Sequence, residues 1–156
     1  MQNLHIQSVT SPAELAACAD VLVQAYNSPP WNDAWTHEKA LEKLLCFYQS
    51  PRFMGWRAVS ENQVVAACVG NVEPYFSGDY FYLKEMFVLP ALQGSGIGGM
   101  LLNRVKLYME ESGIPMLMLF TSNEGFPFGF YEKHGMSEVP GMRMMNWESP
   151  SLAVSE

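Results

Sequence analysis

The chain has 156 residues, of which 49% are apolar, and this length and composition are typical of a single folded domain. Sixteen acidic residues outnumber nine lysines and arginines, so the formal net charge is -7. Binding of nucleic-acid phosphates needs clustered Lys and Arg, so this balance argues against a nucleic-acid partner and mildly favours a cationic one.

Targeting and redox signals are sparse. No basic segment followed by an apolar one stands near the start, so we expect no signal peptide. The longest apolar runs have the length of strands, and we expect no membrane span. The chain has three cysteines, Cys18, Cys46 and Cys68, and no CxxC motif. An odd number without this motif predicts neither a set of disulfides nor a zinc site, and it fits a reducing cytoplasm. Each cysteine lies in an apolar stretch and is interpreted as a small buried hydrophobe.

Helical and strand periodicities alternate along the chain. In chain order the expected elements are a strand at residues 4–9, helices at 11–26 and 36–48, strands at 55–60, 63–71 and 80–88, a glycine-rich turn at 93–99, a helix at 100–109, a strand at 115–122, a short helix at 126–133 and a last strand at 142–147. Ser11 and Glu14 predict a capping box, and Gly135 predicts the end of the short helix. Without internal repeats, this order predicts one α/β domain.

The glycine-rich turn is the sharpest chemical signal. Gly94, Gly96, Gly98 and Gly99 fall between a strand and a helix. Glycines let the backbone turn tightly and approach a ligand, and the amides at the start of a helix favour an anion. The turn therefore predicts a phosphate site, although an ordinary tight turn is the simpler alternative.

Three phosphate-binding motifs compete for this turn. A P-loop needs Gly-Lys-Ser/Thr, whereas Met100 follows Gly99 here. The dinucleotide fingerprint GxGxxG is formally present at residues 94–99, but too little chain follows for a dinucleotide-binding fold. The third motif is Gln/Arg-x-x-Gly-x-Gly/Ala, which residues 93–98 match.

With that motif in place, the sequence resembles the GNAT family of N-acetyltransferases over nearly its whole length. The residues that carry the resemblance are Glu85-Met86-Phe87-Val88 before the turn, the turn itself, and Phe130-Tyr131-Glu132-Lys133-His134-Gly135-Met136, with Met136 where the family more often has Phe. The resemblance implies an α/β (α+β) fold with a mixed, mostly antiparallel central sheet of six or seven strands and about four flanking helices. Residues 149–156 are interpreted as a C-terminal tail, so residues 1–148 are expected to form a single acetyltransferase domain.

The resemblance also implies that acetyl-CoA binds where the strand at 80–88 parts from the strand at 115–122. The pyrophosphate would meet the amides of the turn, and the pantetheine arm would pair with Met86 and Val88 like an added strand. The Val88 N–H would also be placed to polarise the thioester carbonyl. The expected cofactor-binding residues are Met86, Phe87, Val88, Gln93, Gly94, Ser95, Gly96, Ile97, Gly98, Gly99, Asn123 and Phe130.

The implied reaction is direct attack of a primary amine on the thioester in a ternary complex. An amine of pKa ~10.4 is almost entirely protonated at neutral pH, so a base would help. Glu85 is the first candidate base, with Glu73 and Asp79 as weaker ones; pairing of Glu85 with Lys84 or another cation is the structural alternative. Tyr131 matches the family tyrosine that protonates the leaving thiolate, and a core tyrosine is the alternative there.

The acceptor is expected to be a small cationic amine. Trp31, Asp33 and Trp35, together with Glu85, are the candidate residues for holding its ammonium by cation–π contact and charge; the tryptophans could equally be loop anchors and Asp33 a local cap. No metal site is predicted. A protein N-terminus or lysine, a non-catalytic CoA-binding module and a dinucleotide oxidoreductase remain as alternatives. The resemblance also leaves a homodimer open.

Overall fold

The computed structural model describes residues 3–123 and 125–152. The chain divides into two compact units, Met1–Phe120 and Thr121–Glu156. Within the described residues, no helix is long and apolar enough to cross a membrane.

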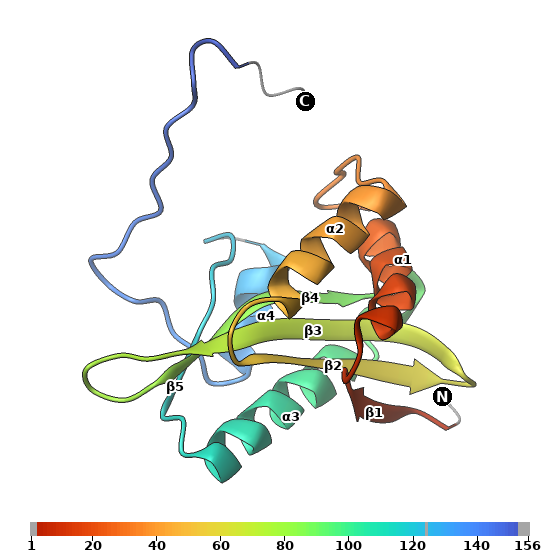
Figure 1. Cartoon of the computed structure of the whole chain (residues 1–156), viewed down its shortest axis with the longest axis horizontal. Coiled ribbons are helices and arrows are strands. Elements are labelled where there is room, and N and C mark those ends of the chain that lie inside the picture. The colour runs from red at the N-terminus through yellow and green to blue at the C-terminus, as the bar shows by residue number, and fades with distance from the viewer. Residues whose placement is uncertain (1–2, 124, 153–156) are drawn as a thin grey trace. The chain divides into compact units, whose positions relative to one another are not determined.

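A five-stranded sheet forms the centre of the first unit. Its strands are β1 (His5–Ser8), β2 (Phe53–Ser60), β3 (Gln63–Glu73), β4 (Tyr80–Val88) and β5 (Met116–Met118). They lie side by side in chain order (Figure 1). Neighbours are antiparallel except for β4 and β5, which are parallel. The mixed, mostly antiparallel sheet is thus confirmed, but five strands are found in the described residues where six or seven were expected.

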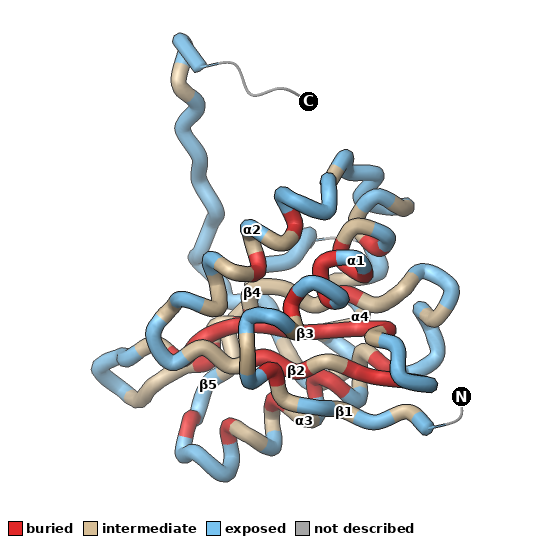
Figure 2. Tube along the Cα trace, turned by 45° about the vertical axis from the view of Figure 1, so that its right-hand side comes forward, coloured by how far each residue is buried: buried red, intermediate tan, exposed pale blue. Residues whose placement is uncertain are grey.

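Helices cover both faces of this sheet (Figure 1). α1 (Leu15–Tyr26) and α2 (His37–Tyr48) lie on one face, called the α1/α2 face below, and α3 (Ile97–Ser112) lies on the other. Two short 3-10 helices, η1 (Pro12–Glu14) and η2 (Pro90–Leu92), precede α1 and α3. The red, buried stretches in Figure 2 lie along the inner strands and along parts of α1, α2 and α3.

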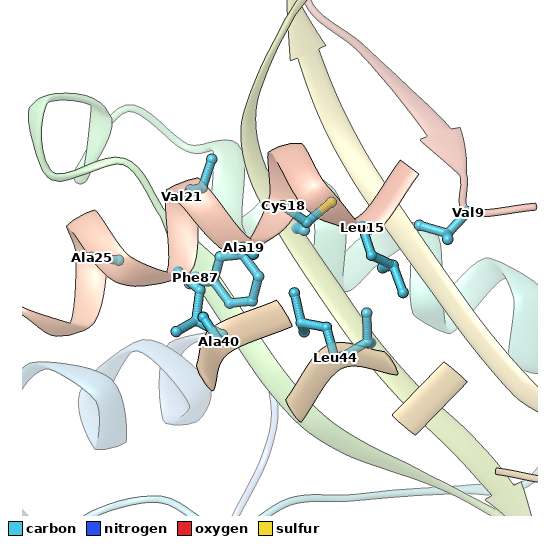
Figure 3. Packing of buried hydrophobic residues seen from close by; sticks show 12 residues of the cluster. Val9, Leu15, Cys18, Ala19, Val21, Ala25, Ala40, Leu44 and Phe87 are labelled. Carbon is cyan, nitrogen blue, oxygen red and sulfur yellow. The ribbon is translucent and has the colours of Figure 1, made fainter. Parts of the chain in front are cut away.

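The fully buried residues of the core under α1 and α2 are small or aliphatic, apart from the ring of Phe87. Figure 3 shows Leu15, Cys18 and Ala19 of α1, Leu44 of α2 and Phe87 of β4 in one buried cluster. Burial of this apolar surface is what holds the two helices on the sheet, since each helix has an apolar stripe toward it.

One of two helix starts agrees with the prediction from the sequence, and the capping predicted at the other is not found. The Thr36 side chain accepts a hydrogen bond from the Lys39 amide at 3.1 Å and caps α2, at the position where the sequence predicts the helix to start. Ser11 does not cap a backbone amide, so the predicted capping box is wrong. Its hydroxyl instead donates to Glu14, whose carboxylate also accepts the Thr10 hydroxyl at 2.8 Å.

A β-bulge interrupts β4 beside its pairing with β3. Val69 lies opposite Glu85 and Gly70 opposite Leu83, so Lys84 has no partner residue. An extra residue of this kind reverses the inward and outward alternation of a strand. Accordingly Phe81 packs on Tyr108 of α3, with ring centroids 6.4 Å apart, whereas Phe87, an even number of residues later, packs in the core under α1 and α2.

The parallel strand β5 is shorter and more exposed than the sequence indicates. The strand expected over residues 115–122, buried on both faces, is limited to Met116–Met118, and Met116 is 45% exposed. Its pairing with β4 ends at Tyr82 opposite Met118. The bulge at Lys84 redirects β4 directly after this point, which accounts for the early end of the ladder.

The second unit contains α4 (Phe126–Lys133), with the bounds that the sequence predicts. Its end is a Schellman motif: the Met136 amide donates to the Tyr131 carbonyl at 3.0 Å and the Gly135 amide to Glu132 at 3.0 Å. Gly135 has φ 87°, which a residue without a side chain adopts readily.

The last predicted strand, at residues 142–147, is wrong. This segment has no strand assignment, and Met144 and Trp147 are 82% and 81% exposed. Alternation of apolar and polar residues is a local signal, whereas a strand also needs a neighbouring strand to bond to.

Candidate functional site

Glu85 of β4 is held from two helices. Its Oε2 accepts a hydrogen bond from the Tyr26 hydroxyl of α1 at 2.6 Å, and its Oε1 pairs with Nζ of Lys43 on α2 at 2.9 Å. The Glu85 side chain is 12% exposed and that of Lys43 36%. The candidate base is therefore fixed in position by one neutral and one charged donor, and the cation that pairs with it is Lys43 rather than Lys84.

Aromatic rings surround these polar groups. The Lys43 ammonium lies 5.1 Å from the centroid of Trp35 and 5.9 Å from that of Phe47. The Tyr26 ring meets Trp31 edge-on at 5.3 Å. Trp31 and Trp35 thus contact the two residues that hold Glu85.

The loop that carries the two tryptophans is tied to itself. Asn27 bonds both the amide and the carbonyl of Trp35, at 2.8 and 3.0 Å, and the Trp35 indole donates to Asp33 at 3.0 Å. Asp33 is exposed, and its carboxylate accepts this local bond from a side chain. Of the candidate acceptor residues, Trp31, Trp35 and Glu85 share one set of contacts, and Asp33 is linked to it through Trp35.

The weaker base candidates have other partners. Asp79 pairs with Arg52 at 2.9 Å. Glu73 lies opposite Tyr80 in the pairing of β3 with β4, and burial, followed by the charge of the Glu73 carboxylate, raises the pKa of Tyr80. Burial and then the charges of Glu73, Tyr80 and Glu85 raise the pKa of Tyr82 as well, so both hydroxyls keep their protons at neutral pH.

The glycine turn has the conformation that a phosphate site needs. Gly94 and Gly96 have φ 82° and 92°, and a Cβ built at either would meet open space. Gly96 is the N-cap of α3, no side chain caps the helix, and Gly94, Ser95 and Gly96 are exposed. Helix α3 therefore begins at an exposed turn. Its first backbone N–H groups have no acceptor within the helix, and the helix dipole favours an anion at this end.

The backbone of β4 before the turn has an open edge. Among the described residues no strand pairs with β4 beyond Tyr82 on the side of β5. Side chains reach two of its carbonyls: the Tyr26 hydroxyl, which donates to Glu85, also lies 3.2 Å from the Met86 carbonyl oxygen, and Gln93 donates to that of Val88 at 3.3 Å. Met86, Val88 and Gln93, all expected at the cofactor, are thus neighbours, and Phe87 between them is buried in the core.

The remaining expected residues belong to the second unit. Phe130 and Tyr131 lie on α4, with ring centroids 5.1 Å apart, and Phe130 also contacts His134 at 4.5 Å. Asn123 is exposed in a bend before α4. Their roles remain predictions.

Sequence reasoning did not identify Tyr26 and Lys43 as the partners of Glu85. For Lys43 a signal exists, because it is a charged residue in the helical stripe between Ala40 and Phe47, both of which face the core. Tyr26 could be named only as the end of the first helix. In the described part of the chain, no group of three or more His, Cys, Asp or Glu could hold a metal ion.

A family comparison bears on this arrangement. The model of the acetyltransferase (GNAT) family matches residues 18–136, which include β4, the glycine turn and α4. The chain belongs to the GNAT family.

Individual relatives are distant. The ribosomal protein bS18-alanine N-acetyltransferase of Haemophilus influenzae is 26% identical over 91 residues, which are 58% of this chain and only 60% of that protein's length. An aminoglycoside acetyltransferase from an uncultured soil metagenomic sample shares the fold with a TM-score of 0.75 and 14% identity, over 94% of this chain and 96% of the other. An aminoglycoside N-acetyltransferase in complex with CoA has a TM-score of 0.71 and 16% identity, over 95% of both chains.

Proposed function

We propose that this GNAT protein transfers the acetyl group of acetyl-CoA to a primary amine of a small acceptor. The observation that carries the proposal is the joint placement of an open, glycine-lined helix start, an open strand edge and a fixed carboxylate on one strand–turn–helix segment. Family membership supports the same reaction class.

The residues present fit coenzyme A. Gly94 and Gly96 leave space where other residues would place a Cβ, and the α3 amides behind them suit a pyrophosphate. The β4 edge at Met86 and Val88 suits an extended arm that pairs with backbone groups. When bound, acetyl-CoA supplies the activated acetyl group.

The residues of the chain supply positioning and proton transfer. Glu85 takes one proton from the acceptor nitrogen, directly or through water. Each carboxylate oxygen offers two lone pairs, so the bonds to Tyr26 and Lys43 leave capacity for this proton. As the neutral nitrogen forms the C–N bond and the C–S bond breaks, a hydroxyl donates a proton to sulfur, and the second proton that the nitrogen then loses restores this hydroxyl through water; Tyr131 is our candidate for the donor.

Two kinds of acceptor are supported by the relatives' names. The aminoglycoside acetyltransferases support a small-molecule amine, and the bS18-alanine enzyme supports a protein N-terminus. We prefer a small-molecule acceptor because the aminoglycoside acetyltransferase structures match almost the whole chain, whereas the bS18-alanine enzyme matches 58% of it.

The test is an acetylation assay that detects free thiol, with acetyl-CoA and a panel of small amines, a peptide with an N-terminal alanine and lysine peptides. We expect turnover with at least one small amine and N-acetyl product by mass spectrometry. Turnover with the peptides alone would replace the small acceptor by a protein. Binding of acetyl-CoA without turnover on any amine would support the non-catalytic module instead.

A further inference from the structure

The bulge in β4 brings two oppositely charged neighbours to the same face of the sheet. In a regular strand Lys84 and Glu85 would point to opposite faces. Here Lys84 is the extra residue, its ammonium lies 5.2 Å from the Phe47 ring of α2, and Glu85 reaches Tyr26 and Lys43. Both side chains therefore reach the α1/α2 face, where the acceptor is proposed to bind.

The charges on this face are unevenly matched. Glu85 already has a cationic partner in Lys43. The Lys84 ammonium lies over the rings of Phe47 and Tyr82, at 5.2 and 5.5 Å, and no carboxylate of the described residues pairs with it.

The other acids named above have other neighbours. Glu73 lies opposite Tyr80 in the pairing of β3 with β4, Asp79 pairs with Arg52, and Asp33 accepts a hydrogen bond from the Trp35 indole. Glu85 thus has two ammonium groups near it, those of Lys43 and Lys84, and of the two only Lys43 forms an ion pair with a carboxylate of the described residues.

These charges conflict with a small polycation as acceptor. Its additional ammonium groups would meet Lys43 and Lys84, and like charges at close range disfavour binding. An amine that also carries a carboxylate has the complementary pattern, because its nitrogen would meet Glu85 while its carboxylate supplies the counter-ion that Lys84 lacks.

We propose that the acceptor is an amine with a carboxylate close to it, as in an amino acid, and that Lys84 binds this carboxylate while Glu85 receives the amine. This inference rests on the proposed acetyl transfer and specifies its substrate class. It replaces the small cationic acceptor that the sequence suggested.

The experiment compares each amino acid with its own carboxamide, which keeps the amine but removes the anion, and adds spermidine and kanamycin as cationic probes. We expect kcat/KM for the preferred acid to exceed that for its amide by about tenfold or more, because the free energy of one charge-assisted hydrogen bond corresponds to a factor of this size. Lys84→Met should abolish the acid-to-amide ratio by raising KM for the acid, and Lys84→Arg should retain it.

Lys39→Met is the matched control, because Lys39 lies on α2 in an exposed pair with Glu42. The acid-to-amide ratio of kcat/KM in this variant should equal that of the wild type. Preference of the wild type for spermidine or kanamycin over every acid would overturn this inference and leave the acetyl transfer intact. An acid-to-amide ratio that survives Lys84→Met would also overturn it. Acetylation of no amine in any class would instead refute the proposed function, and this inference with it.

Discussion

At the scale of single residues, Glu85 is held by two donors from two helices. The Tyr26 hydroxyl and the Lys43 ammonium approach different oxygens of its carboxylate, at 2.6 and 2.9 Å. Bonds to a charged group are shorter and stronger than neutral ones, so this carboxylate has one defined orientation. A base with a fixed orientation is useful in catalysis because it need not be reordered when the acceptor binds.

Glu85→Gln removes the base but keeps the shape of the side chain. We expect kcat to fall by about 10²-fold or more, with the largest loss at low pH, where nearly all of the acceptor is protonated and the proton must be removed. The measurement is a pH–rate profile beside that of Glu42→Gln, an exposed acid of α2 that should behave as the wild type. A profile that keeps its shape in Glu85→Gln would remove Glu85 as the base.

At the scale of elements, the bulge of β4 and the start of α3 together shape the site. The bulge turns Lys84 and Glu85 to one face, and the turn exposes the first amides of α3. The sequence predicts β4 to its last residue, but it does not predict the bulge, because pairing with β3 decides which residue is extra. The same limit explains the wrong prediction of a strand at residues 142–147: apolar and polar residues alternate there, but no neighbouring strand of the described residues pairs with them.

Two glycines allow the turn to be tested against a matched control. Gly96 at the start of α3 and Gly113 at its end both have positive φ, 92° and 70°, and open space at Cβ. Alanine at either should cost about 1–2 kcal/mol of stability through backbone strain. Only Gly96→Ala should also weaken CoA binding, by about tenfold, in calorimetry. Equal CoA affinity in the two variants would mean that the turn does not bind the cofactor.

At the scale of the whole molecule, net charge and local charge differ. The chain carries a net charge of -7, which attracts cations over a distance, whereas Lys43 and Lys84 place two positive charges near Glu85. Composition could therefore suggest a cationic acceptor but could not place the lysines, since their positions depend on α2 packing over the bulge. The glycine turn and Glu85, in contrast, could be named from the sequence because each lies in a short contiguous motif.

Burial also separates the three cysteines, although the sequence predicted that all would be buried. Cys18 and Cys68 are buried and Cys46 is exposed. Burial raises the pKa of Cys18 to about 11 and that of Cys68 further. We expect one thiol to react with a disulfide reagent at pH 8 in the native protein, three after unfolding, and none rapidly in native Cys46→Ser.

The same shifts give stability a pH dependence. The folded protein keeps the two buried protons, while unfolded thiols lose theirs above a pKa of about 8.5. Unfolding therefore releases protons between about pH 8.5 and 11, and the free energy of unfolding should fall as the pH rises through that range. Reaction of two or more thiols in the native protein at pH 8 would contradict this assignment of burial.

The central claim is that the amides of the glycine turn and the adjoining edge of β4 bind coenzyme A, and backbone amide NMR of the ¹⁵N-labelled chain titrated with CoA tests it most directly. The account predicts that the largest shift changes fall on the amides of residues 94–99 and 86–88, with none on titration with NADH. Saturable CoA binding that leaves those amides unchanged, or shifts there caused by NADH and not by CoA, would contradict it.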